Sequence, residues 1–100
     1  MKIGNLEING FAALAPMAGV ADRAMREICR EYGAAYTVSE LISSKGISMN
    51  DRKSQTLMSV HEKERPIAVQ LFGCDPDVMA SAARTAQQQA PDFIDINMGC

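Results

Sequence analysis

The 100-residue sequence has no tryptophan, a single histidine and only three cysteines, which form no C-x-x-C pair. An odd number of widely spaced cysteines argues against a disulfide framework and against a zinc site, and it favours a reducing cytoplasm. No apolar run is long enough for a signal peptide or a membrane span. We therefore expect a cytoplasmic protein that binds neither a membrane nor a metal ion.

The sequence also has no large excess of positive or negative charge. The net charge is −2, which excludes a strongly basic surface spread over the whole segment. Any nucleic-acid partner therefore requires a local basic patch, or basic surface elsewhere in a longer protein. The remaining composition, 47% hydrophobic and 22% charged, is ordinary for a soluble globular chain.

Apolar runs and turn residues divide the chain into alternating strands and helices. A small hairpin is expected near residues 3–8. A helix capped by Asp22 is expected to run to Tyr32, with Gly33 as its stop. The segment 41–59 is polar and predicts a short helix and a long loop. Core strands are predicted at 11–15, 34–38, 67–72 and 93–97, and a further helix at about 76–89.

This alternation predicts a parallel sheet with right-handed crossovers. An open doubly wound sheet and a (β/α)8 TIM barrel both satisfy it. No G-x-G-x-x-G follows the first strand, which argues against the dinucleotide-binding form of the open sheet. About four β/α units account for half of a barrel of the usual size, ~250 residues. We therefore predict an α/β fold, the N-terminal half of a (β/α)8 TIM barrel preceded by a small hairpin.

Four predicted strand ends carry residues suited to chemistry, and in a barrel such ends gather at one face. The run A-P-M-A-G at 15–19 lets the backbone approach a flat ligand closely, although a tight strand-to-helix turn needs the same small residues. Ser39 and Glu40 mark the end of the second strand. Alternation turns Gln70 away from its apolar neighbours and into the barrel. A buried carboxamide needs partners, and we favour a heterocycle edge over a neighbouring strand.

The last strand leads into the strongest candidate site. Alternation places Asp95 and Asn97 on one face of this strand and Ile94 and Ile96 on the other, beneath helices. We expect a hydrogen-bonded structural role for Asp95, because an unpartnered buried carboxylate is costly, and a role in the site for Asn97. Cys100 follows at the rim. An unperturbed thiol has a pKa of about 8.5, so it is mostly protonated at neutral pH and can act as a general acid.

The other reactive residues have simpler interpretations. Cys29 is interpreted as an apolar filler on its helix, and Cys74 is a second candidate thiol near the rim. His61 is expected to be solvated, and Glu62–Arg65 to be an ordinary charged surface turn. Because the best catalytic candidate ends the chain, we expect the sequence to be the N-terminal piece of a longer protein.

Four segments together resemble the tRNA-dihydrouridine synthases, and most closely their B-type bacterial branch. These segments are A-P-M-A-G-V (15–20) followed by Asp22, T-V-S-E (37–40), V-Q-L-F-G (69–73) with D-P (75–76), and D-I-N-M-G-C (95–100). The resemblance covers nearly the whole chain, and the last segment together with Q-L-F-G is its most specific part. Ala21 and Ala90-Pro91 depart from the family pattern, but both lie away from the chemistry.

The resemblance implies an enzyme that reduces the C5–C6 double bond of uridines in tRNA, with FMN as cofactor and NADPH as the reductant that recharges it. Residues 1–100 are then the N-terminal part of an FMN-binding TIM-barrel catalytic domain, truncated after strand four. Hydride passes from reduced FMN to C6, and Cys100 gives a proton to C5. The cofactor carries the redox chemistry, and the uridine must be flipped out of folded tRNA.

The same resemblance assigns the remaining site residues. Asn97 matches a residue near the substrate. Four positions match those that hold the flavin ring, namely Pro16, Met17, Ala18 and Gln70.

Three other interpretations stay open. They are an FMN-dependent reductase or dehydrogenase of free pyrimidines, a non-catalytic RNA-binding remnant, and an open doubly wound sheet whose strand order reverses. The second half of the barrel and the family's C-terminal helical domain for tRNA are absent from this sequence. We therefore expect residues 1–100 alone to be inactive, and the full-length protein to be monomeric.

Overall fold

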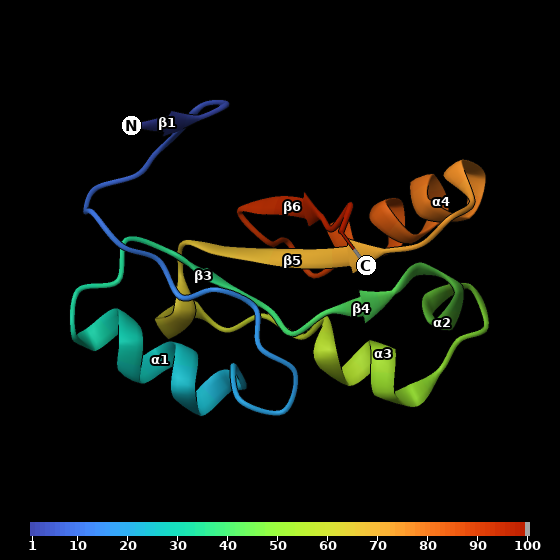
Figure 1. Cartoon of the computed structure of the whole chain (residues 1–100), viewed down its shortest axis with the longest axis horizontal. Coiled ribbons are helices and arrows are strands. Elements are labelled where there is room, and N and C mark those ends of the chain that lie inside the picture. Colours follow the sequence, from blue (N-terminus) through green and yellow to red (C-terminus); the bar gives the residue numbers. More distant parts are fainter. Residues whose placement is uncertain (100) are drawn as a thin grey trace.

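The computed structural model describes residues 1–99 and consists of two β-sheets with helices packed on the larger one (Figure 1). Its strands are β1 (Lys2–Ile3), β2 (Leu6–Glu7), β3 (Thr37–Val38), β4 (Ile42–Ser43), β5 (Ile67–Phe72) and β6 (Phe93–Ile96). Its helices are α1 (Arg23–Glu31), α2 (Ser44–Ser48), α3 (Arg52–Leu57), the 3-10 helix η1 (Glu62–Glu64) and α4 (Pro76–Gln87). Among residues 1–99, no helix has both the length and the apolar character needed to cross a membrane.

The two N-terminal strands form a small sheet of their own. β1 and β2 pair antiparallel, and they stand apart from the main sheet (Figure 1). Gly4 in the turn between them has a φ of +57°, a conformation that glycine adopts without steric cost. The predicted hairpin near residues 3–8 is therefore confirmed.

The strands of the main sheet are all parallel, and β5 lies at its centre. Val38 of β3 pairs with Ala68 of β5, and Ile42 of β4 pairs with Leu71. β6 pairs with the same two residues of β5 from the other side. β3 and β4 therefore share one edge of β5, and β6 occupies the opposite edge.

The order across the main sheet follows the order along the chain. An isolated parallel bridge between Leu14 and Thr37 places the segment before α1 on the far side of β3. The registers therefore give the order residue 14, β3 with β4, β5 and then β6, and within residues 1–99 it does not reverse. A doubly wound sheet requires such a reversal. The arrangement fits an arc of a TIM barrel, although the described residues form no closed barrel.

One extra residue separates β3 from β4. Val38 and Ile42 are four positions apart, whereas their partners Ala68 and Leu71 are three apart. Such a mismatch is a β-bulge, which bends the strand and changes which side its residues face. Val38 accordingly lies with Phe93 on one side of the sheet, and Ile42 lies with Leu71 on the other.

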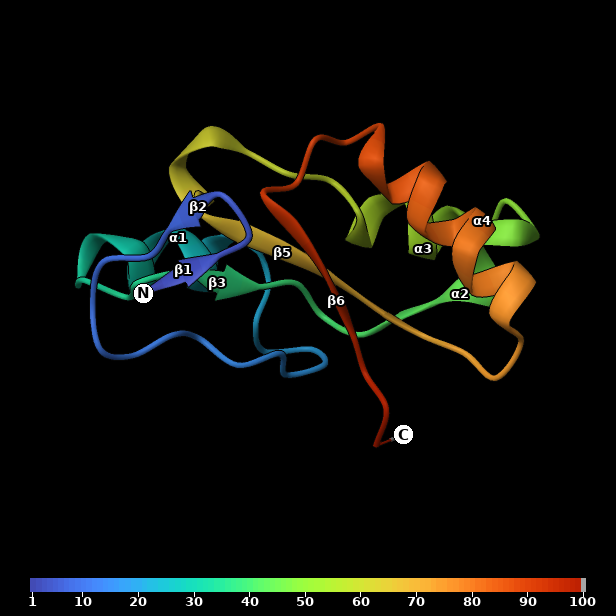
Figure 2. The ribbon, with the colours of Figure 1, turned by 90° about the horizontal axis from the view of Figure 1, so that it is seen from above.

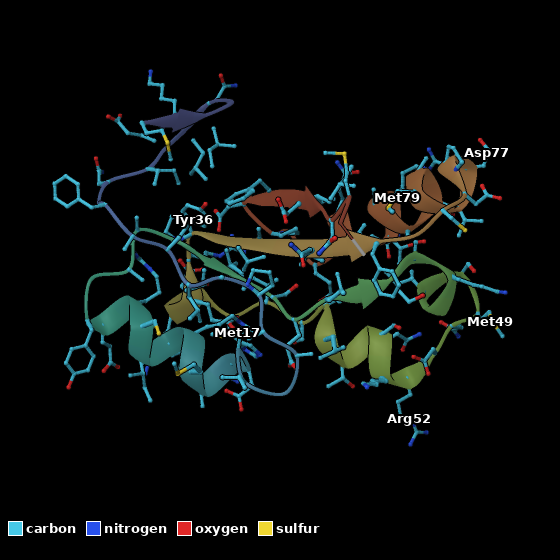
Figure 3. All side chains as sticks on the ribbon, in the orientation of Figure 1. Met17, Tyr36, Met49, Arg52, Asp77 and Met79 are labelled. Atoms are coloured by element: carbon cyan, nitrogen blue, oxygen red, sulfur yellow. The ribbon has the colours of Figure 1, made fainter. Side chains whose placement is uncertain are left out.

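The side of the sheet that carries Leu71 is covered by helices and forms the hydrophobic core. Full burial of each large apolar side chain contributes about 1.5–3 kcal/mol to stability. Met79 of α4 packs against this core (Figure 3). The buried members come from β4, α2, β5 and α4, with one from the end of α3, and are Ile42, Ile47, Met58, Val69, Leu71, Ala82 and Ala86.

Helices α1 and α4 begin at the predicted residues, and α1 ends one residue earlier than predicted, with Tyr32 as its C-cap. Asp22 accepts a hydrogen bond from the Met25 N–H (2.9 Å) at the start of α1. Gly33 follows the end of α1 with a φ of +97°. Asp75 caps α4, and Pro76 is its first residue. β5 has the predicted bounds, and β6 ends one residue earlier than predicted.

The predicted first core strand, 11–15, is not a strand. Two backbone hydrogen bonds and the bridge at Leu14 join this segment to the residues before and in β3. Pro16 has no N–H with which to extend the pairing, and Phe11 is fully exposed. The strand predicted over 34–38 is likewise shortened to β3.

The polar segment 41–59 is more ordered than predicted. It contains β4 and two short helices instead of one helix and a long loop. The side chains of Ser43 and Asp51 accept backbone N–H groups at the starts of α2 and α3. The helices form because both residues are good N-caps.

Glu64 contradicts the prediction of an ordinary surface turn, because it is fully buried. Its carboxylate lies 2.6 Å from the guanidinium of Arg26 in α1. The same carboxylate accepts the His61 N–H (2.8 Å), and the Glu64 carbonyl accepts the Thr37 hydroxyl (3.1 Å). The pair joins positions 38 residues apart, so the local charge pattern contains no sign of it.

Candidate functional site

Gln70, Asp95 and Asn97 form a hydrogen-bonded cluster on the side of the sheet opposite the core. The Gln70 carboxamide nitrogen donates to the carboxylate of Asp95, its register partner on β6. Asn97 Nδ2 donates to Gln70 Oε1 over 3.5 Å. Alternation predicted these three side chains on one face. Ile94 packs against the core as predicted, but Ile96 is exposed instead of lying beneath a helix.

Gln70 is buried, with 5% of its surface exposed, and it is bonded to the neighbouring strand. Within residues 1–99, Gln70 thus has the neighbouring strand as its partner, which is the alternative that the sequence favours less. A carboxamide has two N–H donors and an oxygen with two lone pairs. One donor and one lone pair therefore remain after the bonds to Asp95 and Asn97, and a ligand contact of Gln70 stays a prediction.

The chain turns immediately after the cluster. Gly99 N–H donates to Asn97 Oδ1 (2.9 Å). The Asn97 side chain is thus held between Gln70 and the turn that leads to the last residue. Cys100, the predicted catalytic residue, lies outside the described residues.

The loop 16–21 is folded around one carbonyl group. The Met17 carbonyl accepts the N–H groups of both Val20 (3.0 Å) and Ala21 (2.8 Å). The carbonyl of Ala21, a fully buried residue, accepts a hydrogen bond from Arg26 Nη1 (2.7 Å). Figure 2 shows this loop and the C-terminal end of the chain extending toward the same side of the view.

The amides of this loop fall into two groups. The Gly19 N–H donates to Glu40 Oε1 (2.6 Å), so it is occupied like those of the two residues after it. Across residues 1–99, the N–H groups of Met17 and Ala18 have no hydrogen-bond acceptor. Two adjacent backbone donors are therefore left on an exposed loop, at two of the three loop positions predicted to hold a cofactor.

An open cavity of about 300 Å³ joins the loop to the polar side of the sheet. Pro16 and Asp95 both line it. Tyr36 and Phe93 form part of its wall, with their rings edge to face and 5.4 Å between centroids. Figure 3 labels Tyr36, which directly precedes β3, and Met17, which lies in the loop before α1. The cavity therefore brings the predicted cofactor loop to the residue that is bonded to Gln70.

A second open cavity, of about 630 Å³, lies at the ends of β4 and β5. Lys45 of α2 and Met49, the residue after this helix, line it together with Gly73 and Cys74. Cys74 is exposed there. Apart from Cys74, the second candidate thiol, its lining includes none of the described residues that were predicted for the site, and it shares no residue with the first cavity.

Ser39 and Glu40 were predicted to lie at the end of a strand, but their hydrogen-bond partners were not predicted. The buried Ser39 hydroxyl accepts the Gln70 N–H (3.0 Å). Glu40 reaches the loop through Gly19. Both lie in the bulge between β3 and β4, and the sequence contains no recognisable signal for that bulge.

Shifted pKa values occur outside the cluster. The hydrogen bond from the Arg23 side chain lowers the pKa of Glu27, and the hydrogen bond from the Ser54 backbone N–H lowers the pKa of Asp51. Within residues 1–99, no group of three or more His, Cys, Asp and Glu residues is placed to hold a metal ion.

The family model and the relatives that match this chain all carry the name dihydrouridine synthase. The family model described as dihydrouridine synthase (Dus) matches residues 13–100. The chain is 48% identical over 101 residues to the tRNA-dihydrouridine synthase B of Vibrio cholerae, covering all of this chain and 31% of that protein. Proteins of the same name from Pasteurella multocida and Shewanella oneidensis are 42% and 43% identical over 100 residues and are covered to 30% and 31%. The chain thus spans less than a third of the length of these relatives.

Proposed function

The chain belongs to the dihydrouridine synthase family, and from that premise we propose that it is the N-terminal part of the catalytic domain of a tRNA-dihydrouridine synthase. The domain is a TIM barrel that is cut after its fourth strand in residues 1–100. The reaction is reduction of the C5–C6 double bond of uridine in tRNA by a monomeric cytoplasmic enzyme. The relatives that carry this name support the proposal.

The described residues fit a flat heterocyclic cofactor such as FMN. The unoccupied N–H groups of Met17 and Ala18 are donors, and such a ring has carbonyl oxygens and nitrogens at its edge that accept them. The remaining donor and lone pair of Gln70 suit the same kind of edge. Pro16 sets the conformation of the loop beside them. Bound FMN, recharged by NADPH, supplies the hydride for C6 of the uracil.

The chain itself supplies the proton. Hydride addition at C6 breaks the C5–C6 double bond and leaves an electron pair on C5. The Cys100 thiol donates its proton from Sγ to C5, becomes a thiolate and regains a proton from water, so that one hydride and one proton are added in all. Asn97 positions the uracil next to this thiol.

The observation that supports this assignment best is the hydrogen-bonded path from Gln70 to the residue before Cys100. Gln70 bonds to Asn97, and Asn97 bonds to the N–H of Gly99. A residue proposed to hold the flavin is thereby connected to the turn that carries the proposed acid.

The proposal is tested with the full-length protein in cells that lack their own enzyme for the same uridines. Cys100→Ala should abolish dihydrouridine in tRNA, measured by mass spectrometry, while the purified variant keeps its flavin. Cys29→Ala is the matched control, since Cys29 is half-buried in α1 away from the cluster, and it should keep wild-type levels. Loss of activity in Cys74→Ala but not in Cys100→Ala would show that the acid is misassigned.

The same preparation separates the rival functions. A reductase of free pyrimidines would reduce uracil with NADPH as readily as it reduces tRNA. A non-catalytic RNA-binding module would bind tRNA but leave dihydrouridine unchanged in the wild type. Residues 1–100 alone should hold no flavin and reduce no tRNA, and a yellow, active preparation of them would contradict this part of the proposal.

A further inference from the structure

We propose that Glu40 is a positioning residue, which shapes the loop 16–21 for the cofactor by binding the Gly19 amide. The inference rests on the proposed function, because it assumes that this loop holds FMN. Among residues 1–99, Glu40 makes one hydrogen bond to the loop, at Gly19, so the effect proposed for it on the reaction is indirect. Its side chain is half-buried.

The contact is short and directed. The Glu40 carboxylate accepts the Gly19 N–H at 2.6 Å. A hydrogen bond to a charged acceptor is shorter and stronger than one between neutral groups. The two residues are 21 positions apart, so the bond fixes the loop to the sheet instead of stabilising a local turn.

The bulge explains how Glu40 reaches the loop. The bulge lies between Val38 and Ile42. This stretch has one residue more than the stretch of β5 with which it pairs. A bulge changes the direction of the side chains within it. In this position Glu40 points out of the sheet and toward the residues before α1.

The Glu40 bond restrains the residue of the loop that has the greatest backbone freedom. Gly19 has a φ of +74°, which residues with a side chain rarely adopt. Apart from its two chain neighbours, no described residue has an atom within 4 Å of where a Cβ at Gly19 would stand, so no side chain packs on that side of Gly19. Glu40 acts on one side of this residue, and Arg26 holds the Ala21 carbonyl on the other.

Together these bonds leave two amides available and no others in the loop. The N–H groups of Gly19, Val20 and Ala21 are occupied, and Pro16 has none. Without Glu40, the Gly19 amide becomes a competing donor, and the loop samples other conformations. The orientation of the Met17 and Ala18 donors is then lost for part of the time, which weakens FMN binding.

The test uses Glu40→Ala and Glu40→Gln in the full-length protein. Glutamine keeps an oxygen that accepts the Gly19 N–H, whereas alanine does not. We expect Glu40→Ala to bind FMN about tenfold more weakly than the wild type, measured by quenching of flavin fluorescence. Glu40→Gln should restore most of the affinity. Glu31→Ala, at the exposed end of α1, is the control and should bind FMN normally.

A second measurement detects the hydrogen bond between Glu40 and Gly19 in the absence of flavin. Hydrogen exchange of the loop amides in the flavin-free protein should be faster in Glu40→Ala than in Glu40→Gln and the wild type. Wild-type FMN affinity in Glu40→Ala, or equally weak binding in both variants, would overturn the inference. If the wild type bound no FMN, the proposed function would fail, and exchange at Gly19 would still decide whether Glu40 holds the loop.

Discussion

The Gln70 side chain donates a hydrogen bond to the carboxylate of Asp95, directly across from it on the neighbouring parallel strand. Both groups lie on the side of the sheet that carries no helices in residues 1–99. The bond satisfies a buried amide and a half-buried carboxylate at the same time. It also orients the carboxamide whose oxygen faces Asn97.

Loss of Asp95 should therefore destabilise the full-length protein. Asp95→Leu leaves a buried Gln70 donor without an acceptor, which costs about 1–3 kcal/mol. The double variant Gln70→Leu with Asp95→Leu removes both partners and should recover part of that loss. Chemical denaturation of the single and double variants measures the coupling between them. Strictly additive effects would mean that the bond contributes nothing.

The buried ion pair between Arg26 and Glu64 should be far more sensitive to substitution than an exposed pair. Glu64→Ala leaves the Arg26 guanidinium buried without its counter-charge, and we expect a loss of about 3–5 kcal/mol in the free energy of unfolding. Glu27→Ala removes the partner of the exposed Arg23 in the same helix and is the matched control, with a much smaller effect. Equal losses in the two variants would contradict the assigned burial.

Acid should weaken the start of α3 through Asp51. The hydrogen bond from the Ser54 N–H lowers the pKa of Asp51, so the folded state binds its proton less readily than the unfolded chain. The stability from this group is fully present above the unfolded pKa of about 3.9 and disappears as the pH falls through the lower folded value. Asn at the same position caps a helix without titrating. Wild type should therefore lose stability relative to Asp51→Asn between about pH 5 and pH 3. A pH-independent difference would show that Asp51 is not linked to folding.

Gly73 should tolerate no side chain while Ser44 is present. A Cβ at Gly73 would collide with the Ser44 hydroxyl and would lie 3.3 Å from the Ser44 Cβ. We expect Gly73→Ala to cost about 1–3 kcal/mol, as overpacking does. Adding Ser44→Ala removes the colliding oxygen and should restore part of the loss, measured by thermal unfolding as a double-mutant cycle. If Ser44→Ala gives no relief, the close approach of the two segments is not the cause.

The parts of the fold that depend on local sequence were predictable. The hairpin, α1, β5 and the start of α4 each have their own turn or capping residues, such as Asp22 and Asp75. Alternation along an apolar strand also placed Gln70 and Asp95 on one face. In these cases, the residues that specify the element lie within it or next to it.

The remainder depends on partners that are distant in the chain. The polar stretch after Ser39 contains a strand because it pairs with the second half of β5. Glu64 is buried because Arg26 arrives from α1. The segment 11–15 is not a full strand, because its pairing with the residues around β3 is limited to one bridge at Leu14 and cannot continue through Pro16. None of these relations can be seen in a local window of sequence.

The extra residue between Val38 and Ile42 also has a consequence for natural variation in length. Removing one residue from positions 39–41 would restore simple alternation and keep Ile42 opposite Leu71 on the core side, but it would withdraw Glu40 from Gly19. A single deletion would thus leave the interior intact but release the loop 16–21 from its bond to the sheet. Insertions and deletions in related sequences should therefore avoid these three positions and occur instead at exposed connections such as the one around Asn50.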